Sequence, residues 1–120
     1  MKVQGPDFIA LQWRDKEAGR QFYQEMLGLE LVDYSPPDAF VFDTKPIAFA
    51  IREPLVDLSL SDYRGHGVVL WLLADNTKNV LERLKAKNIE IVRDLAESPF
   101  GMTFTFKDPE GYLVTIHDQG

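Results

Sequence analysis

A chain of 120 residues, of which 45% are hydrophobic and 12% aromatic, has the size and apolar content of one folded domain rather than of a disordered polypeptide. The absence of cysteine excludes disulfides, thiolate metal sites and cysteine nucleophiles. The net charge of -6 disfavours nucleic acid as a partner, because an acidic surface repels phosphate groups, and slightly favours a cationic small molecule.

The first predicted elements are a strand and a helix. Residues 7–13 (DFIALQW) are apolar and predict a strand, and Asp15 is a suitable N-cap for the helix that follows. Apolar residues recur there at helical spacing, at Ala18, Phe22 and Met26. The helix is expected to end in a left-handed conformation at Gly28.

Three further strands are predicted before the midpoint. Residues 29–34 (LELVDY) have strand character, and residues 39–53 contain two strands around a turn at 43–46. The first half is therefore predicted as a βαβββ unit. A polar segment, residues 54–67, follows as a linker.

The second half repeats this order. Residues 68–74 (VVLWLLA) predict a strand, Asn76 a helix cap and Asn88 a left-handed helix end. The expected helix carries an apolar stripe of Val80, Leu81 and Leu84. A strand is predicted over residues 88–92 (NIEIV), followed by a loop over residues 95–101.

The last stretch, residues 100–118, predicts a hairpin around the turn Asp-Pro-Glu-Gly at 108–111. The two halves thus form tandem modules, 7–53 and 68–118, within a single domain over residues 1–120. A module of about 55 residues would hardly bury a core alone. No apolar signal segment precedes the first strand, and the longest apolar run is too short for a bilayer, so we expect a cytoplasmic protein without a membrane partner.

Two segments give this pattern a resemblance to a known family. The sequence FYQEMLGLELV in the first module and FTFKDPEGYLVTIHD at the end of the second resemble the vicinal oxygen chelate superfamily, which includes glyoxalase I, extradiol dioxygenases and bleomycin-resistance proteins. The resemblance covers nearly the whole chain. It implies an α+β fold in which two βαβββ modules form an open, cup-like barrel, and it implies a homodimer.

The resemblance also assigns metal-ligand positions. In the family's metal enzymes, ligands come from the first and last strands of each module. These positions correspond here to Phe8, Val69 (or Val68 with a shift of one residue), Ala50 and Thr115. Only Thr115 has a side-chain oxygen, and divalent ions require converging carboxylate, imidazole or amide donors. We therefore predict no metal site, no cofactor and no catalytic residue.

The same strand faces predict a small-molecule site instead, because such sites combine apolar side chains with a few polar groups. The predicted ligand-binding residues are Phe8, Gln12, Arg52, Trp71, Thr115 and His117. Trp71 could stack on a ligand or fill the core, and Phe8 could plug the cavity. Thr115 could contact a ligand or bond to a neighbouring hydroxyl, and Arg52 with His117 could bind an anion or face solvent.

The sequence and the resemblance therefore predict a metal-free protein that binds an aromatic or cationic compound, with sequestration as its candidate role, as in the bleomycin-resistance branch. Two alternatives remain open. One is a metal-dependent lyase, isomerase or dioxygenase with displaced ligands such as Glu53, His66 and His117. The other is a degenerate module with a structural or regulatory role.

Overall fold

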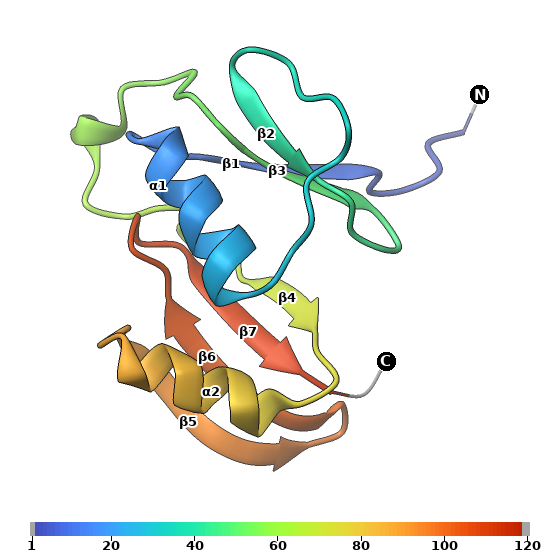
Figure 1. Ribbon diagram of the computed structural model, residues 1–120, viewed down its shortest axis with the longest axis vertical. Helices are drawn as coiled ribbons and strands as arrows, with labels where there is room; N and C mark the ends of the chain where they lie inside the picture. Colours follow the sequence, from blue (N-terminus) through green and yellow to red (C-terminus); the bar gives the residue numbers. More distant parts are fainter. Residues whose placement is uncertain (1, 119–120) are drawn as a thin grey trace. The chain divides into compact units, whose positions relative to one another are not determined.

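The structure, a computed structural model, describes residues 2–118 (Figure 1). Two compact units lie on either side of the bond between Leu60 and Ser61, inside the predicted linker. The fold is α+β, with a three-stranded sheet in the first unit and a four-stranded sheet in the second. Neither sheet closes on itself. Within the described residues, no helix is both long enough and apolar enough to cross a bilayer.

The first unit begins as the sequence predicts. Strand β1 (Phe8–Gln12) leads to helix α1 (Lys16–Gln21), whose first amides, those of Glu17 and Ala18, donate to the Asp15 carboxylate. Gly28 has a φ of 75°, which confirms the left-handed helix end. The expected single α-helix is wrong in one respect, because a π-helical segment, η1 (Phe22–Met26), replaces its second half.

Tyr23 lies at the centre of the first core, although the predicted apolar stripe did not include it. The π-helical segment buries Phe22 and Tyr23 together, and their rings meet edge to face at 5.1 Å. The Tyr23 ring also approaches Phe49 at 5.0 Å and Trp13 at 6.3 Å. Because π turns are wider than α turns, two consecutive aromatic residues can both reach the core here.

Strands β2 (Ala39–Phe42) and β3 (Ala48–Arg52) confirm the two strands predicted over 39–53. Strand β3 is the centre of the sheet, parallel to β1 and antiparallel to β2. The strand predicted over 29–34 is wrong as a continuous element. The segment forms a single bridge, between Leu31 and Phe42, because its backbone bonds to β2 only at the C-terminal end of that strand.

The second unit repeats the plan with a longer sheet. Strand β4 (Leu70–Leu73) pairs in parallel with β7 (Leu113–His117), as β1 pairs with β3. Helix α2 (Thr77–Ala86) follows β4. Its cap is confirmed by the Asn76 side chain, which accepts from the amide of Asn79, and Asn88 has the expected left-handed φ of 59°.

Two long antiparallel strands complete the second sheet, in the order β4-β7-β6-β5 (Figure 1). These are β5 (Ile91–Ser98) and β6 (Gly101–Lys107). The loop predicted over residues 95–101 is wrong, because β5 continues to Ser98 through two register shifts and leaves only a tight turn. The extra residues of the second module therefore extend a strand.

Helix α2 packs against β5 and β6, and it covers one face of the second sheet. Strand alternation assigns to this face the buried apolar residues Phe104, Phe106, Val114 and Ile116. The opposite face carries Trp71, Thr105 and Thr115, and we call it the tryptophan face. A short 3-10 turn, η2 (Leu58–Leu60), is the only helical element between β3 and β4 in the described chain.

Candidate functional site

The tryptophan face brings together three of the predicted ligand-binding residues. Trp71 lies opposite Thr115 on the neighbouring strand, and Leu73 lies opposite His117. The Trp71 ring meets the His117 ring at 5.5 Å and the Phe100 ring at 5.7 Å, both at steep interplanar angles. Trp71 and Phe100 are 48% and 52% exposed, so this three-ring cluster is accessible to solvent. Such a cluster can accept a flat apolar or cationic group.

Thr115 lies beside the ring cluster, and its hydroxyl is already bonded. The Oγ1 atoms of Thr105 and Thr115 are 2.7 Å apart, and both side chains are buried. Of the two alternatives for Thr115, contact with a ligand or a bond to a neighbouring hydroxyl, the structure therefore contains the second. The bond gives each hydroxyl a partner within the protein, and because both side chains are buried the centre of the face presents no exposed polar group.

The remaining predicted residues, Phe8, Gln12 and Arg52, lie in the first unit. Gln12 and Arg52 are register partners on adjacent strands, and each already has local bonds. The Gln12 Oε1 atom accepts from the amides of Leu55 and Val56 at 2.6 and 3.2 Å. These contacts tie the start of the linker to β1.

Arg52 bonds to Asp38 at 2.9 Å, and its Nε donates to the carbonyl of Glu53. A neighbouring carboxylate neutralises much of the field that would attract an anion. Phe8 is 50% exposed, and it lies opposite Ala48 at the start of the sheet. The first unit thus presents an exposed ring and a neutralised arginine.

Two residues of the alternative metal site have local partners. Glu53 pairs with Lys16 at 3.0 Å, and the His66 ring contacts Tyr63 at 4.9 Å. Throughout residues 2–118, the structure contains no group of three or more His, Asp or Glu side chains arranged to hold a metal ion. At the family's ligand positions, Thr115 supplies one neutral oxygen that already bonds to Thr105, and such a donor set does not fit a divalent cation.

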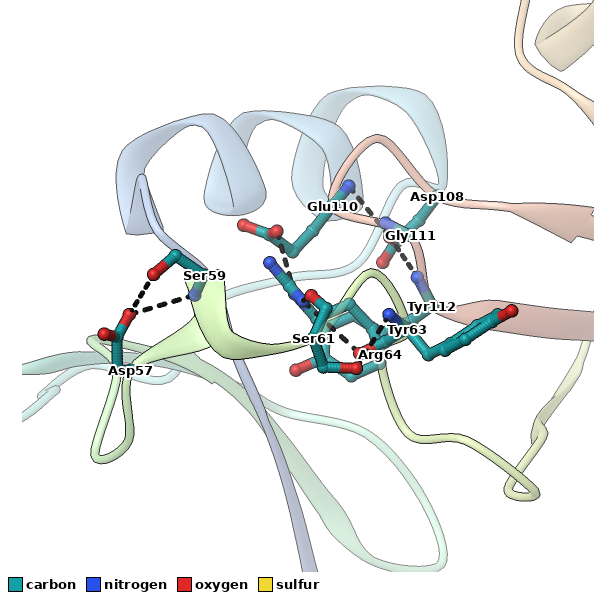
Figure 2. Close-up of polar contacts among 9 residues, drawn as sticks. All are labelled: Asp57, Ser59, Ser61, Tyr63, Arg64, Asp108, Glu110, Gly111 and Tyr112. Carbon is teal, nitrogen blue, oxygen red and sulfur yellow. Dashed lines mark hydrogen bonds and ion pairs between the residues drawn. The ribbon is translucent and has the colours of Figure 1, made fainter.

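Sequence reasoning missed a second polar cluster, at the turn between β6 and β7 (Figure 2). The Arg64 Nε donates to Glu110 at 3.1 Å, and the two side chains are only 7% and 3% exposed. A second Arg64 nitrogen donates to the carbonyls of Ser61 and Tyr63. This arrangement fixes the end of the linker against the turn.

The turn itself is built around Asp108. Its carboxylate accepts the amides of Glu110, Gly111 and Tyr112 at 2.9 to 3.0 Å, and Gly111 has a φ of 116° (Figure 2). A Cβ at Gly111 would lie 3.4 Å from the Arg64 side chain. The sequence predicted the turn, but it did not predict that Arg64 pairs with Glu110, because the two residues are 46 positions apart and no local pattern connects them.

Two exposed carboxylates have shifted pKa values with local causes. The Ser59 hydroxyl, followed by the Ser59 amide, lowers the pKa of Asp57 from its ordinary value. The amide of Leu95, followed by the charge of Lys85, lowers the pKa of Asp94. Both groups are solvated turn or strand carboxylates, and neither shift indicates a general acid or base.

Among protein families, the chain matches the Glyoxalase/Bleomycin resistance protein/Dioxygenase superfamily over residues 5–116. The chain belongs to this superfamily. The match spans both units, so the family resemblance of the two sequence segments is confirmed for the whole fold. No curated protein matches the chain in sequence.

Solved structures of the superfamily fold resemble the chain over nearly its full length. A glyoxalase-related enzyme from Fulvimarina pelagi has a TM-score of 0.76 at 21% identity, covering 98% of this chain and 89% of its own. A lactoylglutathione lyase from Agrobacterium tumefaciens has a TM-score of 0.69 at 21% identity, with coverages of 98% and 96%. TnmS3, an antibiotic binding protein from Streptomyces sp. CB03234, has a TM-score of 0.72 at 17% identity, with coverages of 100% and 99%.

At these identities the similarity establishes the fold. The structures named above include a lactoylglutathione lyase and an antibiotic binding protein. The shared fold therefore does not identify the function of this chain, which has to be inferred from its own residues.

Proposed function

We propose that this superfamily member is a metal-free binding protein for a small, partly apolar compound, which it holds on the tryptophan face of the second sheet. The observation that carries the proposal is the cluster of Trp71, Phe100 and His117, in which two large rings are about half exposed although they contact each other. Aromatic rings that meet at steep angles offer both a face and an edge to a flat ligand.

The ligand class follows from this chemistry. Burial of aromatic surface contributes about 25 cal/mol per Å², from which ordering costs must be subtracted. The Trp71 ring also suits a cationic group, because the ring face attracts positive charge and the protein has a net charge of -6. The antibiotic binding protein of the same fold supports the binding of a small molecule, for which we propose sequestration as the biological role.

A thermal-shift screen of aromatic and cationic compounds tests this proposal. A ligand present at 100 times its Kd stabilises the folded state by about 2.7 kcal/mol, which gives a readily measured rise in Tm. Trp71→Ala should abolish the shift and leave the circular dichroism spectrum unchanged. Tyr34→Ala is the matched control, because Tyr34 is an aromatic residue of the first unit that is 77% exposed. Equal shifts in both variants would refute the site.

The enzyme alternative has a separate test, since the superfamily fold includes a lactoylglutathione lyase. Elemental analysis of untagged protein purified without chelators should find no stoichiometric divalent metal, because the family's ligand positions carry Phe8, Ala50, Val69 and Thr115. Near-stoichiometric zinc, iron, manganese or nickel would favour the enzyme.

We also propose that the chain acts in the cytoplasm as a single domain and assembles as a homodimer. Trp71 and Leu73 on the edge strand β4 are 48% and 63% exposed, which supports a partner for this edge, as a ligand or a second copy. Light scattering coupled to size exclusion measures the mass in solution. A mass of one chain at all concentrations would contradict the dimer.

A further inference from the structure

One transverse row of residues crosses all four strands of the second sheet on the tryptophan face. Strand pairing places Trp71 opposite Thr115, Thr115 opposite Thr105, and Thr105 opposite Arg93. Neighbouring strands are about 4.8 Å apart, so the two ends of the row are separated by roughly 14 Å between Cα atoms.

The direction of Arg93 is supported by its neighbour Asp94. Consecutive strand residues point to opposite faces, and the Asp94 carboxylate lies 3.6 Å from Lys85, which belongs to α2 on the helix-covered face. Arg93 is therefore directed to the tryptophan face, in agreement with its pairing to Thr105. Register shifts on both sides of Arg93 curve β5 at this point.

The chemical groups that remain available lie at the two ends of the row. Trp71 is half exposed and Arg93 is exposed, whereas the two threonines are buried and bonded to each other. Within residues 2–118, no hydrogen bond or ion pair joins the Arg93 side chain to another residue. By contrast, Arg20, Arg52 and Arg64 are each paired with a carboxylate.

We propose that the ligand of the tryptophan face is an elongated anion, with an aromatic ring at Trp71, an apolar spacer across the threonine pair and a carboxylate or similar group at Arg93. This inference rests on the proposed function. Among the ligands considered there, it selects an aromatic compound with a negative charge over a cationic compound. Arginine binds planar oxyanions through two parallel hydrogen bonds, and the satisfied hydroxyls between the ends require no polar group in the spacer.

Naphthylalkanoic acids of increasing chain length, compared with their primary amides, test the proposal on the full chain by calorimetry. The acid whose length matches the row should bind about tenfold more tightly than its amide. Arg93→Ala should lower the acid affinity to that of the amide, and Arg93→Lys should keep part of the preference. Lys87→Ala removes the same charge from an exposed site at the end of α2 and should change neither affinity.

The outcomes separate the two proposals. Trp71→Ala should weaken the acid and the amide equally. If acid and amide bind the natural protein alike, or if Arg93→Ala keeps the acid preference, the anionic ligand class is wrong while the binding function stands. If acids fail to bind and a cationic aromatic compound from the thermal-shift screen binds instead, the inference is again overturned. If no aromatic compound of any charge binds, the proposed function itself fails.

Discussion

The two units share an order of elements but differ in the side chains at their predicted ligand positions. In the first unit, Gln12 bonds to the linker and Arg52 to Asp38, so the polar groups of the predicted site serve local structure. In the second unit, the rings at Trp71 and Phe100 are half exposed. The repeated fold therefore does not repeat the candidate site. Corresponding strands place residues at corresponding positions, but the chemistry depends on which side chains occupy them.

The turns differ in the same manner. At 43–46 the ion pair between Lys45 and Asp43 is exposed, whereas at 108–111 the pair between Arg64 and Glu110 is buried. Exposed pairs contribute little to stability, but a buried charge that loses its partner is costly. The fold should therefore be more sensitive to the loss of a charge at the second turn than at the first.

The largest expected effect on the free energy of unfolding comes from removing the buried ion pair of the second turn. Glu110→Ala leaves the Arg64 guanidinium buried without its carboxylate and should lower the free energy of unfolding by about 3–5 kcal/mol. Asp43→Ala, at the exposed pair, should change it by less than about 0.5 kcal/mol. Urea denaturation measures both. Similar losses in the two variants would show that burial does not distinguish the turns.

A second comparison concerns the centre of each sheet. Thr115 bonds to Thr105 in the second unit, whereas Ala50 lies opposite Val41 in the first. Thr115→Val should cost about 1–3 kcal/mol, because the Thr105 hydroxyl is left buried and unsatisfied. The double variant with Thr105→Val should recover much of this loss. Additive losses in the double variant would contradict the hydroxyl pairing.

The helices allow a third comparison. Gly19 and Val80 occupy the same position relative to the caps Asp15 and Asn76. A Cβ at Gly19 would lie 2.6 Å from Ile51 and 2.8 Å from Trp13, so Gly19→Ala should destabilise by about 1–3 kcal/mol through overpacking.

The matched variant of this comparison is Val80→Ala. Val80 is only partly buried, so its truncation should cost less, below about 1 kcal/mol. Thermal denaturation of both variants ranks them. A larger loss at Val80 than at Gly19 would argue against the close approach of α1 to β3.

The smallest expected effect concerns Asp57, in the first part of the linker. Because Ser59 stabilises the charged form of Asp57, the pKa of Asp57 is lowered, and its contribution to folding is complete above the ordinary pKa. This contribution is lost as the pH falls through the lowered pKa. Ser59→Ala should raise the pKa of Asp57 toward its ordinary value in an NMR titration. An unchanged titration would assign the shift to another cause.

Several local features follow from the sequence because their causes lie within a few residues. Asp15 and Asn76 cap helices, Gly28 and Asn88 end them in left-handed conformations, and Asp108 folds its own turn. Side-chain caps and φ preferences act over one helical turn, so the printed order of residues suffices to predict them. The repeated order of elements predicted the two modules, and the family resemblance added the fold that they form.

Other features required the tertiary structure. The strand predicted over 29–34 has only one bridge, and β5 continues where a loop was expected, because strand pairing depends on distant partners. The sequence placed Arg52 and His117 in a site but gave no reason to select Arg93, whose face depends on two register shifts. A shift of one residue reverses the face of a side chain.

The sequence by itself determined the helix caps, the left-handed helix ends and the turn at Asp108, since each depends on near neighbours. Only the tertiary structure decided which polar groups are already paired, as at Arg64 and Thr115, and which side chains are exposed, as at Trp71. The physical reason is that burial and hydrogen bonding are satisfied between segments that lie far apart along the chain.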